Sequence, residues 1–155
     1  MTGVRDMRSR HIDSFAHTDA DASSVFALLA DGSSWPRWAP IESFELEKFG
    51  DPPPEGVGAI RVFRHGRTTG RDQLVAIEPG RRLSYASLSG LPVHDYQATV
   101  HTDANPHRWY RHPLAFVVPK IFGTGRLLER GLGRFINRCT RGLASYAASR
   151  AATSI

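Results

Sequence analysis

The stretch 126-RLLERGLGRFINRCTRGLASYAA-148 decides the fold. Its apolar residues recur every three or four positions, which predicts one long amphipathic helix, because an α-helix turns by about 100° per residue. The apolar stripe consists of Leu128, Leu132, Phe135, Cys139, Leu143 and Tyr146. An arginine stripe, centred about 165° away around the helix, consists of Arg126, Arg130, Arg134, Arg138 and Arg141. Such a helix needs a large apolar partner for its inner face.

The segments before this helix predict a sheet as that partner. Alternating apolar and polar residues, separated by short turns, favour an antiparallel meander of six strands. The expected strands cover residues 44–47, 59–65, 68–78, 82–88, 93–102 and 108–118. One of the turns is Glu78-Pro79-Gly80-Arg81, in which proline and glycine occupy type II positions. An earlier strand over 10–16 brings the total to about seven.

Two short helices are expected between the first strand and the meander. Asp19 or Asp21 can cap a helix over 22–30. The next segment, 33-SSWPRW-38, predicts a second helical turn, since proline suits the start of a helix. The order of strand, two short helices, six strands and long helix predicts an α+β fold in which a curved antiparallel sheet packs on the C-terminal helix.

Length and composition favour one globular domain over residues 1–155, with a core at about 10–148. Of the 155 residues, 41% are apolar and 23% charged, which excludes disordered, collagen-like and coiled-coil chains. No run of eighteen apolar residues is present, so no transmembrane segment is expected, and residues 1–10 lack the apolar core of a secretory signal. The single cysteine, Cys139, indicates a reducing, cytoplasmic location.

The net charge of +5 comes from 20 basic and 15 acidic residues. A basic protein can bind nucleic acid or anionic membranes through its field alone. Because five arginines share the outer face of one helix, we interpret the excess charge as a solvated surface and expect no nucleic-acid partner. Peripheral binding of an anionic membrane or an acidic partner through the arginine stripe is the alternative.

Four motifs resemble the SRPBCC (START-like, polyketide cyclase/dehydrase) superfamily. They are 21-DASSVFALLAD-31 with 35-WPRW-38, 56-GVGAIR-61, 75-VAIEPGRRLSY-85 and 119-PKIFGTG-125. The resemblance covers roughly residues 10–148. It implies a helix-grip fold, in which the sheet wraps the long helix and leaves an internal cavity for a hydrophobic ligand such as a lipid or polyketide. Some members of the superfamily cyclise or dehydrate polyketides.

The resemblance therefore implies binding of a small hydrophobic ligand between the sheet and the C-terminal helix. Candidate ligand-binding residues are Trp38, Phe63, Tyr85, Tyr96, Trp109, Phe116, Leu128, Leu132, Phe135 and Cys139. For any one of them, plain core packing is the simpler interpretation. Tyr85 and Tyr96 stand out, because a buried hydroxyl needs a partner that a ligand carbonyl could supply.

The alternative function is a polyketide cyclase or dehydratase, although the sequence contains no identifiable catalytic constellation. Such an enzyme needs a polar side chain facing the ligand. The candidates are Asp72, His94, Asp95 and Arg61, and which of them faces inward stays open without the strand register. Cys139 on the apolar stripe is expected to be an inert thiol with a raised pKa.

Histidines gather around the last hairpin, at His94, His101, His107 and His112. With Asp103, two of them could offer a metal the imidazole and carboxylate ligands it needs. We interpret them as exposed loop histidines and expect neither a metal nor a cofactor.

Overall fold

The computed structural model describes residues 10–90, 93–102, 112–123 and 126–153, and the side chains of residues 14–90, 97–102 and 130–153. The strands are β1 (Arg10–Thr18), β2 (Ser43–Lys48), β3 (Ile60–His65), β4 (Thr68–Glu78), β5 (Arg82–Ser89), β6 (Val93–His101) and β7 (His112–Gly123). The helices are α1 (Ala22–Ala30), the 3-10 turn η1 (Gly32–Ser34), α2 (Trp35–Trp38) and α3 (Arg126–Thr153).

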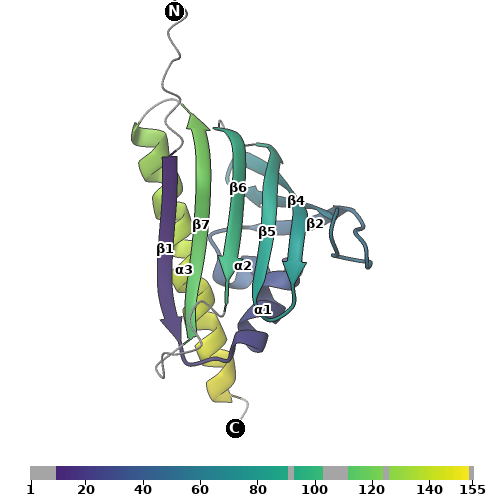
Figure 1. The fold of residues 1–155 in the computed structure, drawn as a ribbon, viewed down its shortest axis with the longest axis vertical. Coiled ribbons are helices and arrows are strands. Elements are labelled where there is room, and N and C mark those ends of the chain that lie inside the picture. Colours follow the sequence, from purple (N-terminus) through teal and green to yellow (C-terminus); the bar gives the residue numbers. More distant parts are fainter. Residues whose placement is uncertain (1–9, 91–92, 103–111, 124–125, 154–155) are drawn as a thin grey trace, which may run out of the picture.

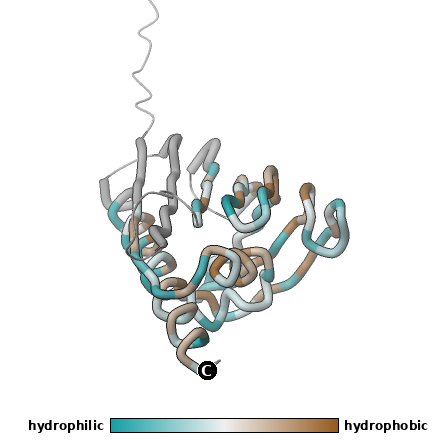
Figure 2. The backbone as a smooth tube through the Cα atoms, turned by 60° about the horizontal axis from the view of Figure 1, so that its bottom comes forward, coloured by the Kyte–Doolittle hydropathy of each residue, from teal (hydrophilic) through white to brown (hydrophobic). Residues whose placement is uncertain are grey.

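The strands form one open antiparallel sheet in the order β1-β7-β6-β5-β4-β3-β2, and the helices lie on one face of it (Figure 1). The long helix α3 packs on β1 and β7, while α1 and α2 pack against α3. Figure 2 shows hydrophobic stretches of the short helices near the centre of the molecule. The predicted helix-grip fold is confirmed. None of the helices in the described residues is long and apolar enough to span a membrane.

The strand β7 differs from its predicted range. The expected strand ended at Val118, but β7 continues to Gly123 and so passes through Pro119. Both neighbouring ladders shift register around the proline, between Val118 and Ile121 against β1 and between Val117 and Lys120 against β6. Because proline lacks an N–H group, an irregular ladder is where a strand can accommodate it. The predicted start of this strand, at residues 108–111, lies outside the described part of the chain.

Helix α1 has the predicted bounds, but its N-terminus is not capped as expected. Asp21 occupies the N-cap position without a side-chain bond to the backbone, and its carboxylate instead accepts a hydrogen bond from the Ser24 hydroxyl. At the other end, the Asp31 carboxylate accepts a bond from the Ser33 backbone N–H at 3.0 Å and so starts η1.

Helix α3 extends to Thr153, five residues beyond the predicted end, because the alanine-rich segment 149–153 contains no helix breaker. Its buried residues are Leu132, Ile136, Cys139, Thr140, Leu143, Ala144 and Ala147. This buried face is rotated by about 60° from the predicted apolar stripe. Phe135 and Tyr146 therefore lie at its border and are only partly buried. Thr140 can be buried because its hydroxyl donates to the carbonyl of Ile136 at 2.8 Å.

The middle of α3 is held by close contacts to β1 and α2. The Ser14 hydroxyl donates to Asn137 Oδ1 at 2.5 Å, and the Thr18 hydroxyl donates to the carbonyl of Ala144 at 2.9 Å. At Gly142, an added Cβ atom would lie 1.8 Å from the carbonyl oxygen of Trp38. Only glycine lets the two helices approach this closely.

Candidate functional site

An aromatic cluster lies between α2 and the sheet. The ring of Trp35 stacks on Phe63 with centroids 4.9 Å apart, meets Trp38 at 4.6 Å and meets Tyr85 edge-on at 6.1 Å. Three predicted lining residues, Trp38, Phe63 and Tyr85, thus come together, each less than a tenth exposed. Trp35, at the centre of the cluster, was missed. The available signal was its place in the WPRW motif, whose other tryptophan, Trp38, was predicted to line the site.

The other predicted lining residues belong to different elements. Leu132 and Cys139 are buried on the inner face of α3 in the same core, and Phe135 is partly buried with its ring 6.0 Å from that of His65. Burial raises the pKa of Cys139 to about 12, as expected for an inert thiol. Tyr96, Phe116 and Leu128 lie on β6, β7 and α3, but their side chains lie outside the described set, as does the whole of Trp109.

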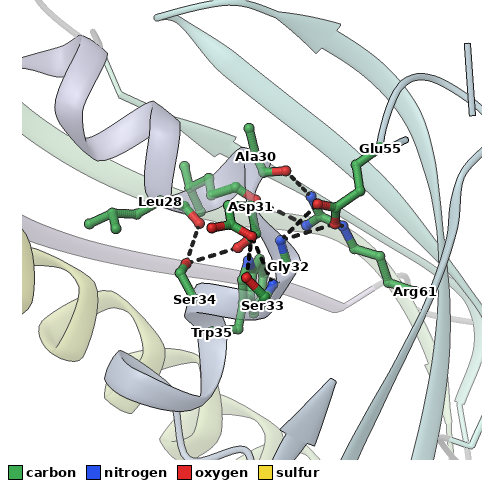
Figure 3. A network of polar contacts seen from close by, with 10 residues as sticks. Leu28, Ala30, Asp31, Gly32, Ser33, Ser34, Trp35, Glu55 and Arg61 are labelled. Atoms are coloured by element: carbon green, nitrogen blue, oxygen red, sulfur yellow. Dashed lines mark hydrogen bonds and ion pairs between the residues drawn. The ribbon is translucent and has the colours of Figure 1, made fainter. Parts of the chain in front are cut away.

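Arg61, a candidate for acid–base chemistry, is only 1% exposed and is bound by the end of α1 (Figure 3). Its guanidinium donates to the carbonyls of Leu29 at 3.0 Å and Ala30 at 2.7 Å, and its Nε lies 2.9 Å from Oε1 of Glu55. The last carbonyls of a helix lack intrahelical partners and form its negative end. Arg61 therefore caps α1 and joins it to β3.

Glu55 completes this junction from the loop between β2 and β3. One carboxylate oxygen of Glu55 accepts the Gly32 N–H at 3.0 Å while it faces Arg61. Burial lowers the pKa of Arg61, and the carboxylates of Glu55 and Asp72 act in the opposite direction. The guanidinium stays charged, since its ordinary pKa exceeds 12. Glu55 was not predicted, because loop residues carry no periodic pattern that would indicate their partners.

Of the two acid–base candidates whose side chains the structure describes, Arg61 is bound to protein groups, whereas Asp72 can contact a ligand. It lies directly opposite Arg61 on β3 and Ser87 on β5. Directly opposed residues point to the same face of a sheet, so Asp72 shares with Arg61 the face that α1 covers. Its side chain is partly exposed, and no residue in the described part of the chain forms a hydrogen bond or ion pair with it. The sequence could have predicted that Asp72 lies opposite Arg61. A two-residue turn at residues 66 and 67 pairs His65 with Thr68, and counting four residues back along each strand then pairs Arg61 with Asp72.

The protein environment changes the acidity of Asp72. Burial raises the pKa of Asp72 to about 7, while the positive charge of Arg61 acts to lower it. On the same face, Leu74 is the next residue of β4 and pairs with Tyr85 of the aromatic cluster. The face of the sheet that the helices cover thus combines apolar rings with a carboxyl group whose pKa lies near neutral pH.

The remaining polar candidates lie mostly outside the described side chains. His94 and Asp95 lie on β6, and His112 begins β7, but their side chains lie outside the described set, as do Asp103 and His107 entirely. In the residues that the structure describes, no three His, Cys, Asp or Glu side chains are grouped as they would be around a metal ion.

Comparisons with known proteins place the fold. The Zhui aromatase/cyclase from Streptomyces sp. R1128 superposes with a TM-score of 0.74 at 17% identity, over 93% of this chain and 96% of its own. A protein from Nitrosospira multiformis gives 0.73 at 16% identity over 92% and 99%. XoxI from Bacillus cereus gives 0.69 at 13% identity over 88% and 94%. Such low identities show the fold alone.

No curated protein matches the sequence. The model of the family described as polyketide cyclase/dehydrase and lipid transport, in contrast, matches residues 9–148, which is nearly the whole chain. The protein therefore belongs to this family, within the SRPBCC superfamily.

Proposed function

We propose that the protein binds a small hydrophobic, ring-containing ligand between the sheet and α3, and that Asp72 contacts the polar group of this ligand. The observation that carries the proposal is the Asp72 carboxyl, which is partly exposed, without a partner among the described residues, and on the face that bears the aromatic cluster. A polar group in such surroundings costs free energy unless a partner satisfies it. A ligand with an apolar body and a hydroxyl or carbonyl group supplies both kinds of contact.

The aromatic rings account for the apolar part of the proposed site. The rings of Phe63 on β3 and Tyr85 on β5 both contact the ring of Trp35. Phe63 lies two residues after Arg61, and Tyr85 pairs with Leu74, two residues after Asp72. Aromatic rings favour offset or edge-on contacts with other rings. The proposed ligand is therefore aromatic or becomes aromatic, as the family description of polyketide cyclases suggests.

Binding is tested by titrating the protein with a hydroxyanthraquinone and following tryptophan fluorescence. Saturable quenching is expected, since Trp35 and Trp38 belong to the cluster. The variant D72N should bind about tenfold more weakly above neutral pH, because a hydrogen bond to a charged group is worth roughly 1.5–3 kcal/mol. The matched control, E47Q, removes a carboxylate that pairs with Arg71 in the exposed part of the sheet and should bind like the wild type.

The proposal fails if a hydroxyanthraquinone does not quench the fluorescence saturably. It also fails in its account of Asp72 if D72N and E47Q bind the ligand with the same affinity as the wild type.

A cyclase or dehydratase activity is the second candidate, and the pKa of Asp72 favours it. A general acid–base group works best when its pKa is near the working pH, and that of Asp72 is about 7. Asp72 would accept a proton from the carbon or hydroxyl that reacts and return it to the departing oxygen. With a linear poly-ketone as substrate, D72N should form product about 100-fold more slowly or worse. An unchanged rate in D72N would exclude Asp72 as the proton-transfer group.

A further inference from the structure

Four exposed arginines line one side of α3. They are Arg130, Arg134, Arg138 and Arg141, and together we call them the arginine face. At about 100° and 1.5 Å per residue, they occupy a sector about 80° wide and span about 17 Å. The buried residues of α3 lie on the opposite side, so the helix can present this face while it remains packed on the sheet.

The described residues do not compensate the charges of the arginine face. Exposed arginines of the sheet pair with carboxylates, as Arg64 does with Glu45, at 3.6 Å, and Arg82 with Glu78, at 2.7 Å. The four arginines of α3 form no ion pair with any residue that the structure describes. From residue 130 to 153 the helix contains no acidic residue at all. An ordinary solvated helix surface mixes both signs of charge, so this segregation calls for a different interpretation.

Beside the arginines, the described side chains of α3 include no large exposed apolar group. Further along the helix, the same side carries only small residues, Ser145, Ala148, Ser149 and Ala152. None of the exposed large hydrophobic side chains of the described chain lies on α3. A flat surface can therefore approach the row from residue 130 onward, where none of the described side chains is a large apolar group that would insert into it.

We propose that the arginine face docks α3 flat against the anionic headgroups of a lipid bilayer. Guanidinium groups form paired hydrogen bonds to phosphate and carboxylate oxygens, and fluid headgroups can rearrange around a straight row of charges. Without apolar side chains to insert, the contact is electrostatic and peripheral. A single-stranded nucleic acid is less well matched, since it needs stacking rings beside the charges.

The test is co-sedimentation with mixed phosphatidylcholine–phosphatidylserine vesicles and with vesicles of phosphatidylcholine alone. The protein should bind the mixed vesicles only, and binding should weaken as salt shortens the Debye length from about 10 Å to about 3 Å. Each basic residue near an anionic surface contributes about a fivefold gain in binding. The variant R134Q/R138Q should therefore bind about 30-fold more weakly.

The matched control is R64Q/R82Q, which removes two exposed positive charges from the sheet. It should retain nearly all vesicle binding, and circular dichroism should show both double variants folded. The proposal is overturned if the wild type does not co-sediment with the mixed vesicles or if the control loses as much binding as R134Q/R138Q. Tighter binding of a DNA duplex or of an acidic protein than of the vesicles would also overturn it.

The vesicle-binding test and the ligand-binding test can be scored independently of each other. D72N leaves the arginine face intact and should bind vesicles like the wild type, whatever it does to ligand binding. A wild-type protein that binds the vesicles but not the ligand would count against the ligand site alone, and one that binds the ligand but not the vesicles would count against the arginine face alone.

Discussion

Replacement of Asp72 by asparagine should stabilise the protein, and only at neutral and higher pH. The folded protein holds the pKa of Asp72 at about 7, compared with an ordinary value of 3.8. Between these two values the folded state binds a proton that the unfolded state has released. The free energy of unfolding therefore falls as the pH rises through this window, and the full penalty is present above pH 7.

The size of the effect follows from the shift in pKa. About three units correspond to roughly 4 kcal/mol at 1.36 kcal/mol per unit. Because solvent still reaches the Asp72 side chain, we expect about half of this, or about 2 kcal/mol. Asparagine has nearly the same shape and cannot ionise, so D72N should recover that amount. For a chain of this size the gain corresponds to a rise in Tm of about 4–8 °C.

The assay is thermal unfolding of D72N and the wild type, followed by circular dichroism at about pH 4 and about pH 8.5. The two proteins should unfold together at the lower pH and separate at the higher one. E47Q should show no such gain, because hydrogen bonding to Arg71 holds the pKa of Glu47 below its ordinary value. A D72N variant that is no more stable at high pH, or that keeps its advantage at pH 4, would refute the reasoning.

Three further predictions concern the packing around the site. R61M should lower the free energy of unfolding in urea by about 3–5 kcal/mol, because Glu55 and two helix carbonyls lose their buried cation. G142A should lower the stability by about 1–3 kcal/mol through overlap with the Trp38 carbonyl, whereas G131A, which points into open space, should raise the Tm slightly. The buried Cys139 thiol should resist a disulfide reagent at about pH 8 until denaturant is added.

Local signals in the sequence were sufficient for many elements. The helix over 22–30 and the strand over 68–78 have the predicted bounds. Turn residues mark their ends, Asp31-Gly32 after the helix and Pro79-Gly80 after the strand. At the latter, the Arg81 N–H donates to the Glu78 carbonyl at 3.0 Å, and Gly80 has the positive φ of 75° that a type II turn requires.

Features that depend on two elements at once were not predicted. The passage of β7 through Pro119 depends on register shifts in both neighbouring strands, which the pattern of one strand does not contain. The different surroundings of Arg61 and Asp72 could not be predicted for a similar reason. Both are polar residues in strands, but one meets the end of α1 and the other meets no partner in the described residues. The position of α1 on the sheet determines that Arg61, and not Asp72, binds the end of the helix.

The anchoring of α3 at its middle determines how the helix can move. Ser14, Thr18 and Trp38 contact it between Asn137 and Ala144, so a tilt of α3 against the sheet would pivot in that segment. Its first residue lies eleven positions before Asn137, or about 17 Å away, so a tilt of about 10° moves that end by about 3 Å. Such a tilt leaves the contacts between Asn137 and Ala144 nearly unchanged. A movement of the helix against the sheet would therefore be smallest in this anchored segment and largest at its two ends.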